Sequence, residues 1–247
     1  AVALTALAAT LVVGQGTQPF KLGTFEQGGR TVVGRVLKDS IVIDFARASA
    51  ALKSPASRVA SPADMKDLIA RYDAGLRSRI VEIIGHVGDP TRPNRPAFVH
   101  DLKAVKILPP IMYPQTMLNM AVNYREHALE MGGAATSPTG PGAALPGTKS
   151  APGIWERQAD DTRWNPYLFT KLPSAVIAAG ESIQLPAGRT QIDWECELGV
   201  VIGARASRVG ADLAPNYIFG YTIENDVSDR GGRGDTRHGG DWLIGKS

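Results

Sequence analysis

The segment from Trp194 to Gly203 constrains the fold most, because acidic and apolar residues alternate along it. Successive side chains of a β-strand point to opposite faces. One face of the predicted strand is apolar throughout: Cys196, Leu198, Val200 and Ile202. The other face carries Glu195 and Glu197 side by side, and Gly199 leaves space next to them. Neighbouring carboxylates repel unless a cation compensates them, so this strand indicates either a divalent-metal site or the polar face of a half-exposed sheet.

A second stretch, from Tyr217 to Val227, shows the same division. Its apolar side chains fall on one face, while Glu224 and Asp226 fall on the other with Gly220 and Thr222. Asp226 is therefore the candidate for a third carboxylate ligand. Three oxygen ligands, with positions left for water or substrate, suit Mg²⁺ better than Mn²⁺ or Ca²⁺.

A short helix is predicted around His127 and Glu130, which lie three residues apart and so share one helix face. A carboxylate beside an imidazole favours a general base that takes a proton from water. The alternative is a surface histidine with a salt-bridge partner. Lys246 is a candidate for stabilising a developing oxyanion, or else an ordinary surface lysine.

The single cysteine and the distribution of charge argue against disulfides, cysteine-based metal clusters and nucleic-acid binding. Cys196 is the only cysteine, so an intramolecular disulfide and a cysteine-based metal cluster are both excluded. The net charge of +3 indicates anionic partners only weakly. Three arginines between 230 and 237 lie among glycines, but no aromatic residue interleaves them, and we expect no nucleic-acid binding.

The chain divides into a mixed N-terminal part and a β-rich C-terminal part. Residues 20–45 predict a small β meander, Ser61-Pro62 begins a helix that runs past Ile80, and residues 105–108 predict another strand. After Pro166 we expect strands at 175–177, 195–202 and 217–227. The fold class is therefore β-dominated α+β, with domains at 18–110 and 111–247.

Two segments have no clear place in either domain. Residues 1–17 begin with thirteen mostly apolar residues, too few to span a bilayer. They indicate a remnant of an export signal or, alternatively, a buried strand or helix. Gly132 to Gly153 consists almost entirely of small residues and proline, which predicts a long loop. That loop is either a lid over a site or a harmless insertion.

Six segments of the chain resemble the catalytic domain of the fumarylacetoacetate hydrolase family in their order and approximate spacing. The first holds Asn123 and Tyr124 with His127 and Glu130. The others are 169–175, 193–198, 219–222, 225–230 and 245–247.

The resemblance implies a mixed β-roll after a smaller N-terminal α/β domain, assembled as a homodimer. It implies Mg²⁺ or Mn²⁺ on Glu195, Glu197 and Asp226, and a 2-oxo acid or 1,3-dicarbonyl substrate. It also implies that His127 and Glu130 activate water and that Lys246 supports the charged intermediate. Substrate contacts are implied for three further residues: Tyr124, Lys171 and Arg230. We therefore expect a metal-dependent hydrolase that cleaves a carbon–carbon bond in acylpyruvate-like or fumarylacetoacetate-like compounds.

Departures from the family keep alternatives open. Asp229 stands where relatives have a small residue, and family members continue for about a hundred residues after the Gly-Lys-Ser at 245–247. We therefore expect a fragment that folds poorly in isolation. A lyase, hydratase, isomerase or decarboxylase on a related 2-oxo acid is the alternative activity, and a non-catalytic metal-binding relative is the alternative class. Family membership favours the cytoplasm, and an export signal favours secretion.

Overall fold

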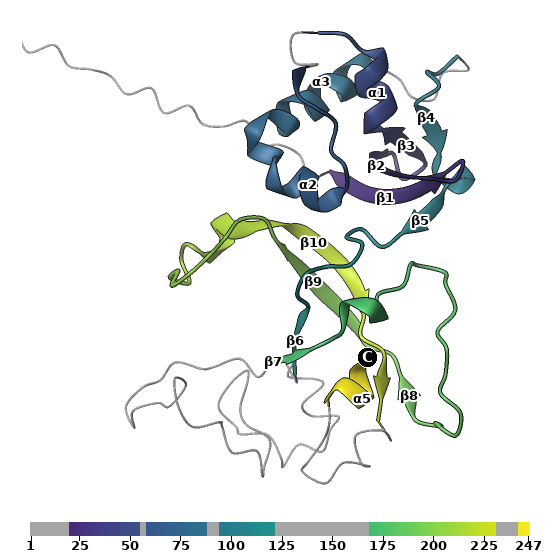
Figure 1. Cartoon of the computed structure of the whole chain (residues 1–247), viewed down its shortest axis with the longest axis vertical. Helices are drawn as coiled ribbons and strands as arrows, with labels where there is room; N and C mark the ends of the chain where they lie inside the picture. The colour runs from purple at the N-terminus through teal and green to yellow at the C-terminus, as the bar shows by residue number, and fades with distance from the viewer. Residues whose placement is uncertain (1–19, 55–57, 88–93, 122–167, 231–241) are drawn as a thin grey trace, which may run out of the picture. The chain divides into compact units, whose positions relative to one another are not determined.

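The computed structural model describes residues 20–54, 58–87, 94–121, 168–230 and 242–247 (Figure 1). The chain forms two compact units, Ala1–Pro110 and Ile111–Ser247, and each is described by itself. The predicted helix around His127, the small-residue loop and the N-terminal apolar segment all lie outside the described residues.

The first unit contains a five-stranded antiparallel sheet in the order β4-β3-β2-β1-β5. Its strands are β1 (Lys21–Gln27), β2 (Arg30–Leu37), β3 (Ile41–Asp44), β4 (Val99–Asp101) and β5 (Lys106–Leu108). The predicted meander is confirmed, since β1, β2 and β3 pair in sequence order. Gly28 and Gly29 adopt φ of 58° and 72° at the first turn, a region that glycine enters without steric cost.

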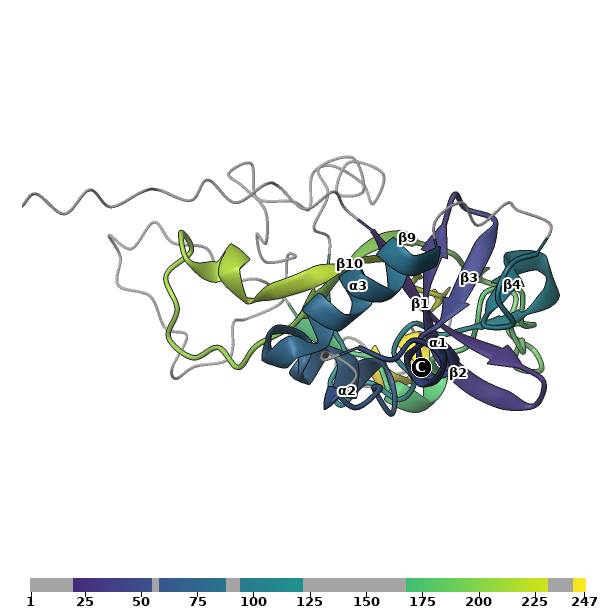
Figure 2. The same cartoon turned by 90° about the horizontal axis from the view of Figure 1, so that it is seen from above.

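Helices cover one side of this sheet, as Figures 1 and 2 both show. They are α1 (Phe45–Ala51), α2 (Met65–Ala70), the π-helix η2 (Tyr72–Leu76) and α3 (Arg77–Val87), and a 3-10 turn, η3 (Leu102–Ala104), follows β4. The side chain of Asp44 caps α1 by accepting the N–H of Arg47 at 3.1 Å. This helix was not predicted, although Asp is a strongly preferred N-cap residue.

The single helix predicted from Ser61-Pro62 is wrong in two respects. It begins later, at Met65, where the side chain of Asp64 accepts the N–H of Asp67 at 2.7 Å. It is also interrupted, because Gly75 has a φ of 104°, which no residue in a regular helix adopts. The apolar side chains of Leu68, Leu76 and Ile80 are nonetheless buried, so the helical spacing identified the core side of both segments.

The second unit consists of three two-stranded antiparallel sheets, all within the described residues. The pairs are β6 (Leu118–Met120) with β7 (Leu168–Thr170), β8 (Ile192–Asp193) with β11 (Ser228–Asp229), and β9 (Cys196–Ile202) with β10 (Ile218–Asn225). The short helices η5 (Pro173–Ala175) and η6 (Ala214–Tyr217) lie between strands, and α5 (Trp242–Lys246) follows β11. The strand predicted at 175–177 is wrong, because Pro173 opens the 3-10 turn η5 there.

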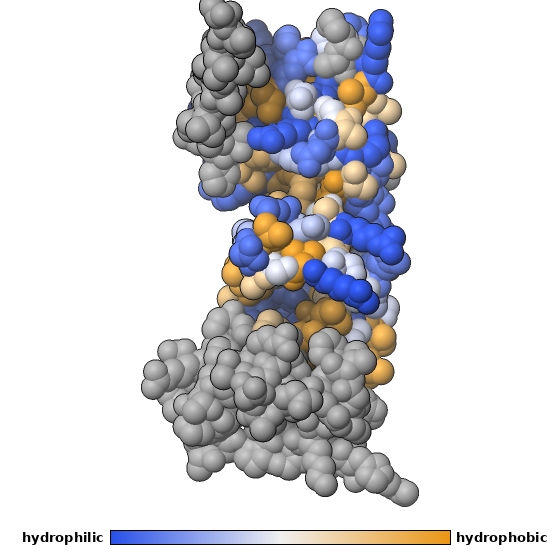
Figure 3. Space-filling view, turned by 90° about the vertical axis from the view of Figure 1, so that its left-hand side faces the viewer, coloured by the Kyte–Doolittle hydropathy of each residue, from blue (hydrophilic) through white to orange (hydrophobic). Residues whose placement is uncertain are grey.

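The β9–β10 hairpin confirms the predicted alternation of faces. Leu198 pairs with Ile223 and Val200 with Tyr221 on one face, and these four side chains are 49–72% exposed. Apolar side chains accordingly reach the surface of the molecule between charged ones (Figure 3). On the opposite face the residues are partly buried. Among the described residues, no helix has the length and apolar character needed to cross a membrane.

Candidate active site

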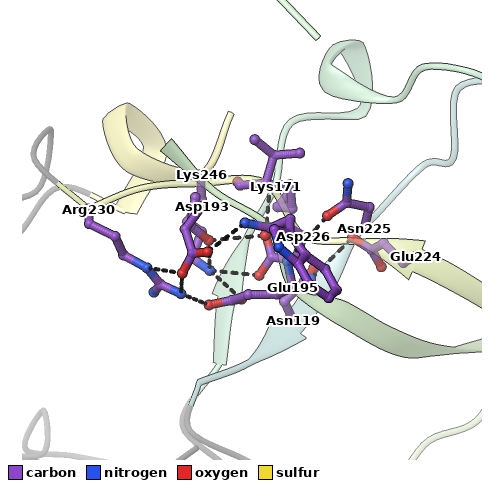
Figure 4. A network of polar contacts seen from close by, with 12 residues as sticks. Asn119, Lys171, Asp193, Glu195, Glu224, Asn225, Asp226, Arg230 and Lys246 are labelled. Carbon is purple, nitrogen blue, oxygen red and sulfur yellow. Dashed lines mark hydrogen bonds and ion pairs between the residues drawn. The ribbon is translucent and has the colours of Figure 1, made fainter. Parts of the chain in front are cut away.

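The backbone brings two of the predicted ligands together at the end of the β9–β10 hairpin. Glu195 immediately precedes β9 and Asp226 immediately follows β10. The N–H of Asp226 donates to the carbonyl oxygen of Glu195 at 2.8 Å, and the N–H of Glu195 donates to Oδ1 of Asn225 at 3.2 Å. Antiparallel pairing therefore places two carboxylates that are distant in the sequence next to each other (Figure 4).

Glu197 lies on the same face of β9, as predicted, but Gly199 does not leave open space beside it. A Cβ atom at Gly199 would lie 2.8 Å from the methyl carbon of Thr222, so the threonine occupies that position. Glu224 pairs with Glu197 across the hairpin and accepts a hydrogen bond from Asn119 at 3.2 Å. A fourth acidic side chain therefore belongs to the cluster.

Lys246, on α5, connects the two adjacent carboxylates. Its Nζ lies 2.8 Å from Oε2 of Glu195, 2.8 Å from Oδ2 of Asp226 and 2.5 Å from Oγ of Ser228. The hydroxyl of Ser228 donates to the carbonyl of Asp226, so it accepts from Lys246. All three N–H donors of the ammonium group are thus used, and its charge also lies 5.0 Å from the centre of the Phe169 ring.

Lys171 approaches the same aspartate on its other oxygen. Its Nζ lies 2.8 Å from Oδ1 of Asp226 and 3.1 Å from the carbonyl oxygen of Val227. The side chains of Lys171 and Asp226 are 9% and 2% exposed. Asp226 is thus a buried carboxylate with one ammonium group on each oxygen.

Arg230 holds the outer side of the cluster. Its guanidinium contacts Oε1 of Glu195 and lies 2.9 Å from Oδ2 of Asp193. The main-chain N–H of Arg230 donates to Gln191 at 2.8 Å, which continues the pairing of β11 with β8. Desolvation lowers the pKa of Arg230, but hydrogen bonds to Asp193 and Glu195 outweigh it and raise the pKa overall.

Asp229, the residue before Arg230, also forms an ion pair that holds β11 in place. Its carboxylate is mostly buried and pairs with Arg189 at 3.2 Å, tying β11 to the segment before β8. The acidic residue that departs from the family pattern therefore has a partner in this chain.

The pKa values of Asp226 and Glu197 shift in opposite directions because the surroundings of the two carboxylates differ. Burial would raise the pKa of Asp226, but hydrogen bonds from Lys171 and Lys246 lower it below its ordinary value. Burial raises the pKa of Glu197, and the charges of Glu195, Asp226 and Glu224 raise it further, against a smaller opposing effect from Lys246. No ion pair joins Glu197 to a cation among the described residues.

Among the described residues, the cluster has an excess of negative charge. The described carboxylates are Asp193, Glu195, Glu197, Glu224 and Asp226, and the described cations are Lys171, Arg230 and Lys246. Five carboxylates and three cations leave a formal charge of −2 when all are ionised.

The donor chemistry fits a hard divalent cation, which prefers carboxylate oxygens. The present side-chain arrangement is less suitable. Among the described residues, no three acidic, histidine or cysteine side chains converge as a ligand set. Lys246 lies between Glu195 and Asp226 instead.

Sequence reasoning anticipated part of this network. The structure brings together six predicted residues, which are Lys171, Glu195, Glu197, Asp226, Arg230 and Lys246. Tyr124, His127 and Glu130 lie outside the described residues. Asp193 and Ser228 were not assigned a role, although Asp193 precedes the alternating strand and Ser228 follows Asp226 by two residues.

Comparison with known proteins decides the family. The model of the fumarylacetoacetate (FAA) hydrolase C-terminal domain matches residues 116–247, more than half of the chain. The chain belongs to the fumarylacetoacetate hydrolase family. The fold agrees: fumarylacetoacetate hydrolase from psychrophilic Exiguobacterium antarcticum superposes with a TM-score of 0.56 at 21% identity, over 93% of this chain and 62% of that one.

Named relatives in this family have different activities. Oxaloacetate tautomerase YisK of Bacillus subtilis is 28% identical over 85% of this chain and 60% of its own length. The mitochondrial oxaloacetate tautomerase fahd2 of Xenopus laevis is 27% identical over 58% of this chain and 36% of its own. Maleylpyruvate hydrolase from Sphingobium sp. SYK-6, solved with manganese(II) and pyruvate, superposes with a TM-score of 0.54 at 22% identity, over 85% of this chain and 59% of that one. This chain thus spans less than two thirds of each relative.

Proposed function

We propose that this chain carries the site of a divalent-metal-dependent hydrolase that cleaves a carbon–carbon bond in an acylpyruvate-like or fumarylacetoacetate-like 2-oxo acid. The observation that carries the proposal is the acidic cluster, whose formal charge of −2 matches one divalent cation. Glu195, Glu197 and Asp226 would hold Mg²⁺ or Mn²⁺. The manganese and pyruvate in the structure of maleylpyruvate hydrolase support this choice of cation and substrate class.

When bound, the cation would polarise the oxygens of the 2-oxo acid and stabilise negative charge on them. The chain's own residues divide the remaining work. Arg230 presents a guanidinium at the edge of the cluster, where it can bind a substrate carboxylate. The ammonium group of Lys246 can turn to a developing oxyanion, and that move also lets Glu195 and Asp226 approach a shared cation. The family resemblance adds Tyr124 as a further substrate contact, whereas Lys171, for which it implies the same role, is bonded to Asp226.

Hydrolysis also needs an activated water molecule. We assign this step to His127, which takes a proton from water, with Glu130 orienting the imidazole. Hydroxide then attacks the carbonyl distal to the 2-oxo group, the carbon–carbon bond breaks, and its electron pair leaves on the substrate as an enolate. Lys246 stabilises the negative charge during that step.

A second candidate is tautomerisation of oxaloacetate, and the names of the Bacillus and Xenopus relatives favour it. This reaction moves a proton between carbon and oxygen of the substrate and consumes no water. The same acidic cluster would serve it, whereas the water-activating pair would not be required. Lyase, hydratase and decarboxylase activities on a related 2-oxo acid, and a non-catalytic metal-binding role, remain alternatives.

Product analysis separates these functions. The chain is incubated with Mn²⁺ and either an acylpyruvate panel or enol-oxaloacetate, and pyruvate release and the loss of enol absorbance are followed in parallel. A hydrolase releases pyruvate from an acylpyruvate, and His127→Ala lowers that rate at least about a hundredfold with unchanged Mn²⁺ affinity. Loss of enol absorbance without bond cleavage would replace the hydrolase by the tautomerase. A chain that binds Mn²⁺ but turns over neither substrate class would favour the non-catalytic role.

Assembly is part of the same proposal. We expect a homodimer, which size-exclusion chromatography with light scattering would show as twice the chain mass of 26.2 kDa.

A further inference from the structure

Two lysines contact Asp226, but they hold different oxygens. Lys246 lies on Oδ2, which is the oxygen that faces Glu195, since the same ammonium group also bonds Oε2 of Glu195. Lys171 lies on Oδ1. In Figure 4 the two lysine side chains reach Asp226 from different elements. The side of Asp226 shared with Glu195 is therefore separate from the side held by Lys171.

Lys171 donates two hydrogen bonds within the described residues. One binds the carboxylate of Asp226 and the other the carbonyl of Val227, so a single ammonium group fixes the side chain and the backbone of adjacent residues. Lys171 as a whole is 7% exposed, and its described hydrogen bonds direct the ammonium group to Asp226 and Val227.

The segment that carries Lys171 is itself fixed. Lys171 follows β7 directly, and the N–H of Leu172 donates to Oγ of Ser247 at 2.9 Å. Phe169, two residues earlier, is buried and lies against Lys246. The position of the Lys171 ammonium group is thus set by β7 on one side and by the end of α5 on the other.

From this geometry we infer that Lys171 is a positioning residue: it holds Oδ1 of Asp226 and so presents Oδ2, together with Glu195, to the divalent cation. The inference rests on the proposed function, and it assigns Lys171 a structural task in place of direct substrate contact. Partners that orient a metal ligand contribute about 10- to 100-fold to metal affinity. The positive charge of Lys171 has the opposite effect, since it repels a nearby cation. The sign of the change on substitution therefore reports which effect dominates.

The test is calorimetric titration of Mn²⁺ into the metal-stripped chain and into three variants. Lys171→Met removes the charge and the hydrogen bonds, Lys171→Gln removes the charge but keeps a donor on a shorter side chain, and Lys171→Arg keeps the charge and donors. Lys103→Met, at an exposed lysine, is the matched control. We expect Lys171→Met to lose about 10- to 100-fold in affinity, Lys171→Gln to lose less, and Lys171→Arg and Lys103→Met to stay within about threefold of the parent. The conservative Arg variant keeps the test valid if the Met variant does not fold.

The outcomes separate this inference from the function on which it rests. A parent that binds Mn²⁺, together with a Lys171→Met variant that is folded and binds it as tightly or more tightly, overturns the positioning role. If Lys171→Arg is the only folded variant, an unchanged affinity supports the role and a loss comparable to that expected for Met overturns it. A parent that binds no Mn²⁺ overturns the proposed metal platform and the positioning role with it.

Discussion

The two units of this chain differ in the balance of apolar and charged side chains that they bury. The first buries an apolar core between its sheet and helices, with Ile43 and Leu68 fully inaccessible. The second exposes large apolar side chains on the β9–β10 hairpin and buries the charged side chains of Lys171, Asp226 and Lys246 instead. Burying charge costs free energy unless each charge is paired. In the first unit the buried apolar side chains stabilise the fold. In the second, the buried charged side chains belong to the candidate site.

Arg79 shows how the first unit treats its own buried charge. This side chain is 2% exposed and donates to the carbonyls of Ser49 and Leu52 at the end of α1, and to Glu82 one turn later on α3. Every contact is to a structural element of the same unit. The buried lysines of the second unit, by contrast, converge on one aspartate.

Asp226→Ala should lower the free energy of unfolding more than the other substitutions considered. It leaves two buried ammonium groups without their shared partner, which costs about 3–5 kcal/mol of unfolding free energy. All four tryptophans lie between residues 111 and 247, so urea unfolding followed by tryptophan fluorescence reports on the second unit. Asp212→Ala, at an exposed aspartate, is the control. Equal midpoints for the two variants would mean that the lysine–aspartate pairs do not stabilise this unit.

Ile43→Ala tests the apolar core of the first unit. Ile43 is fully buried, and deleting such a side chain costs about 2–5 kcal/mol. The described helices longer than five residues lie in this unit, so loss of helical circular dichroism follows its unfolding. We expect a lower urea midpoint by circular dichroism with little change in tryptophan fluorescence. A parallel shift of both signals would show that the two units unfold as one.

Substitution of Asp67 should change the free energy of unfolding by a smaller amount that depends on pH. Hydrogen bonds from Arg71 and from the N–H of Ala63 lower the pKa of Asp67 to about 2. A lowered pKa means that the stabilisation is present above the ordinary value of about 4 and is lost as pH falls through about 2. Asp67→Asn should therefore cost about 0.5–1 kcal/mol at neutral pH, with the difference from the parent closing between pH 4 and pH 2. A difference that stays constant over that range would contradict the assignment.

Ile223→Ala should change the free energy of unfolding least. Ile223 is 72% exposed, and exposed substitutions usually change stability by less than about 0.5 kcal/mol. The matched comparison is Ile43→Ala, measured in the same urea series. A cost at Ile223 comparable to that at Ile43 would show that the apolar face of the hairpin is covered in solution.

Local patterns predicted part of the secondary structure but not the contacts between the elements. Alternation predicted the faces of β9 and β10, and the β-rich runs within residues 20–45 predicted the meander. The break at Gly75 was missed, because a single glycine within a helical pattern does not require a positive φ. The meeting of Lys171 and Lys246 on Asp226 depends on how β7 and α5 approach β10, and no spacing within any one of these elements encodes that approach.

The excess carboxylate charge of the cluster should bind one divalent cation. The most direct measurement is calorimetric titration of Mn²⁺ into the parent chain and into Glu197→Gln, with Glu181→Gln, at an exposed glutamate, as control. Glu197 is the informative position, because no described cation pairs with it and its loss should leave the fold intact. We predict one site of about micromolar affinity in the parent and the control, and at least about tenfold weaker binding in Glu197→Gln. Equal affinity in all three proteins, or no binding by a folded parent, would contradict the claim.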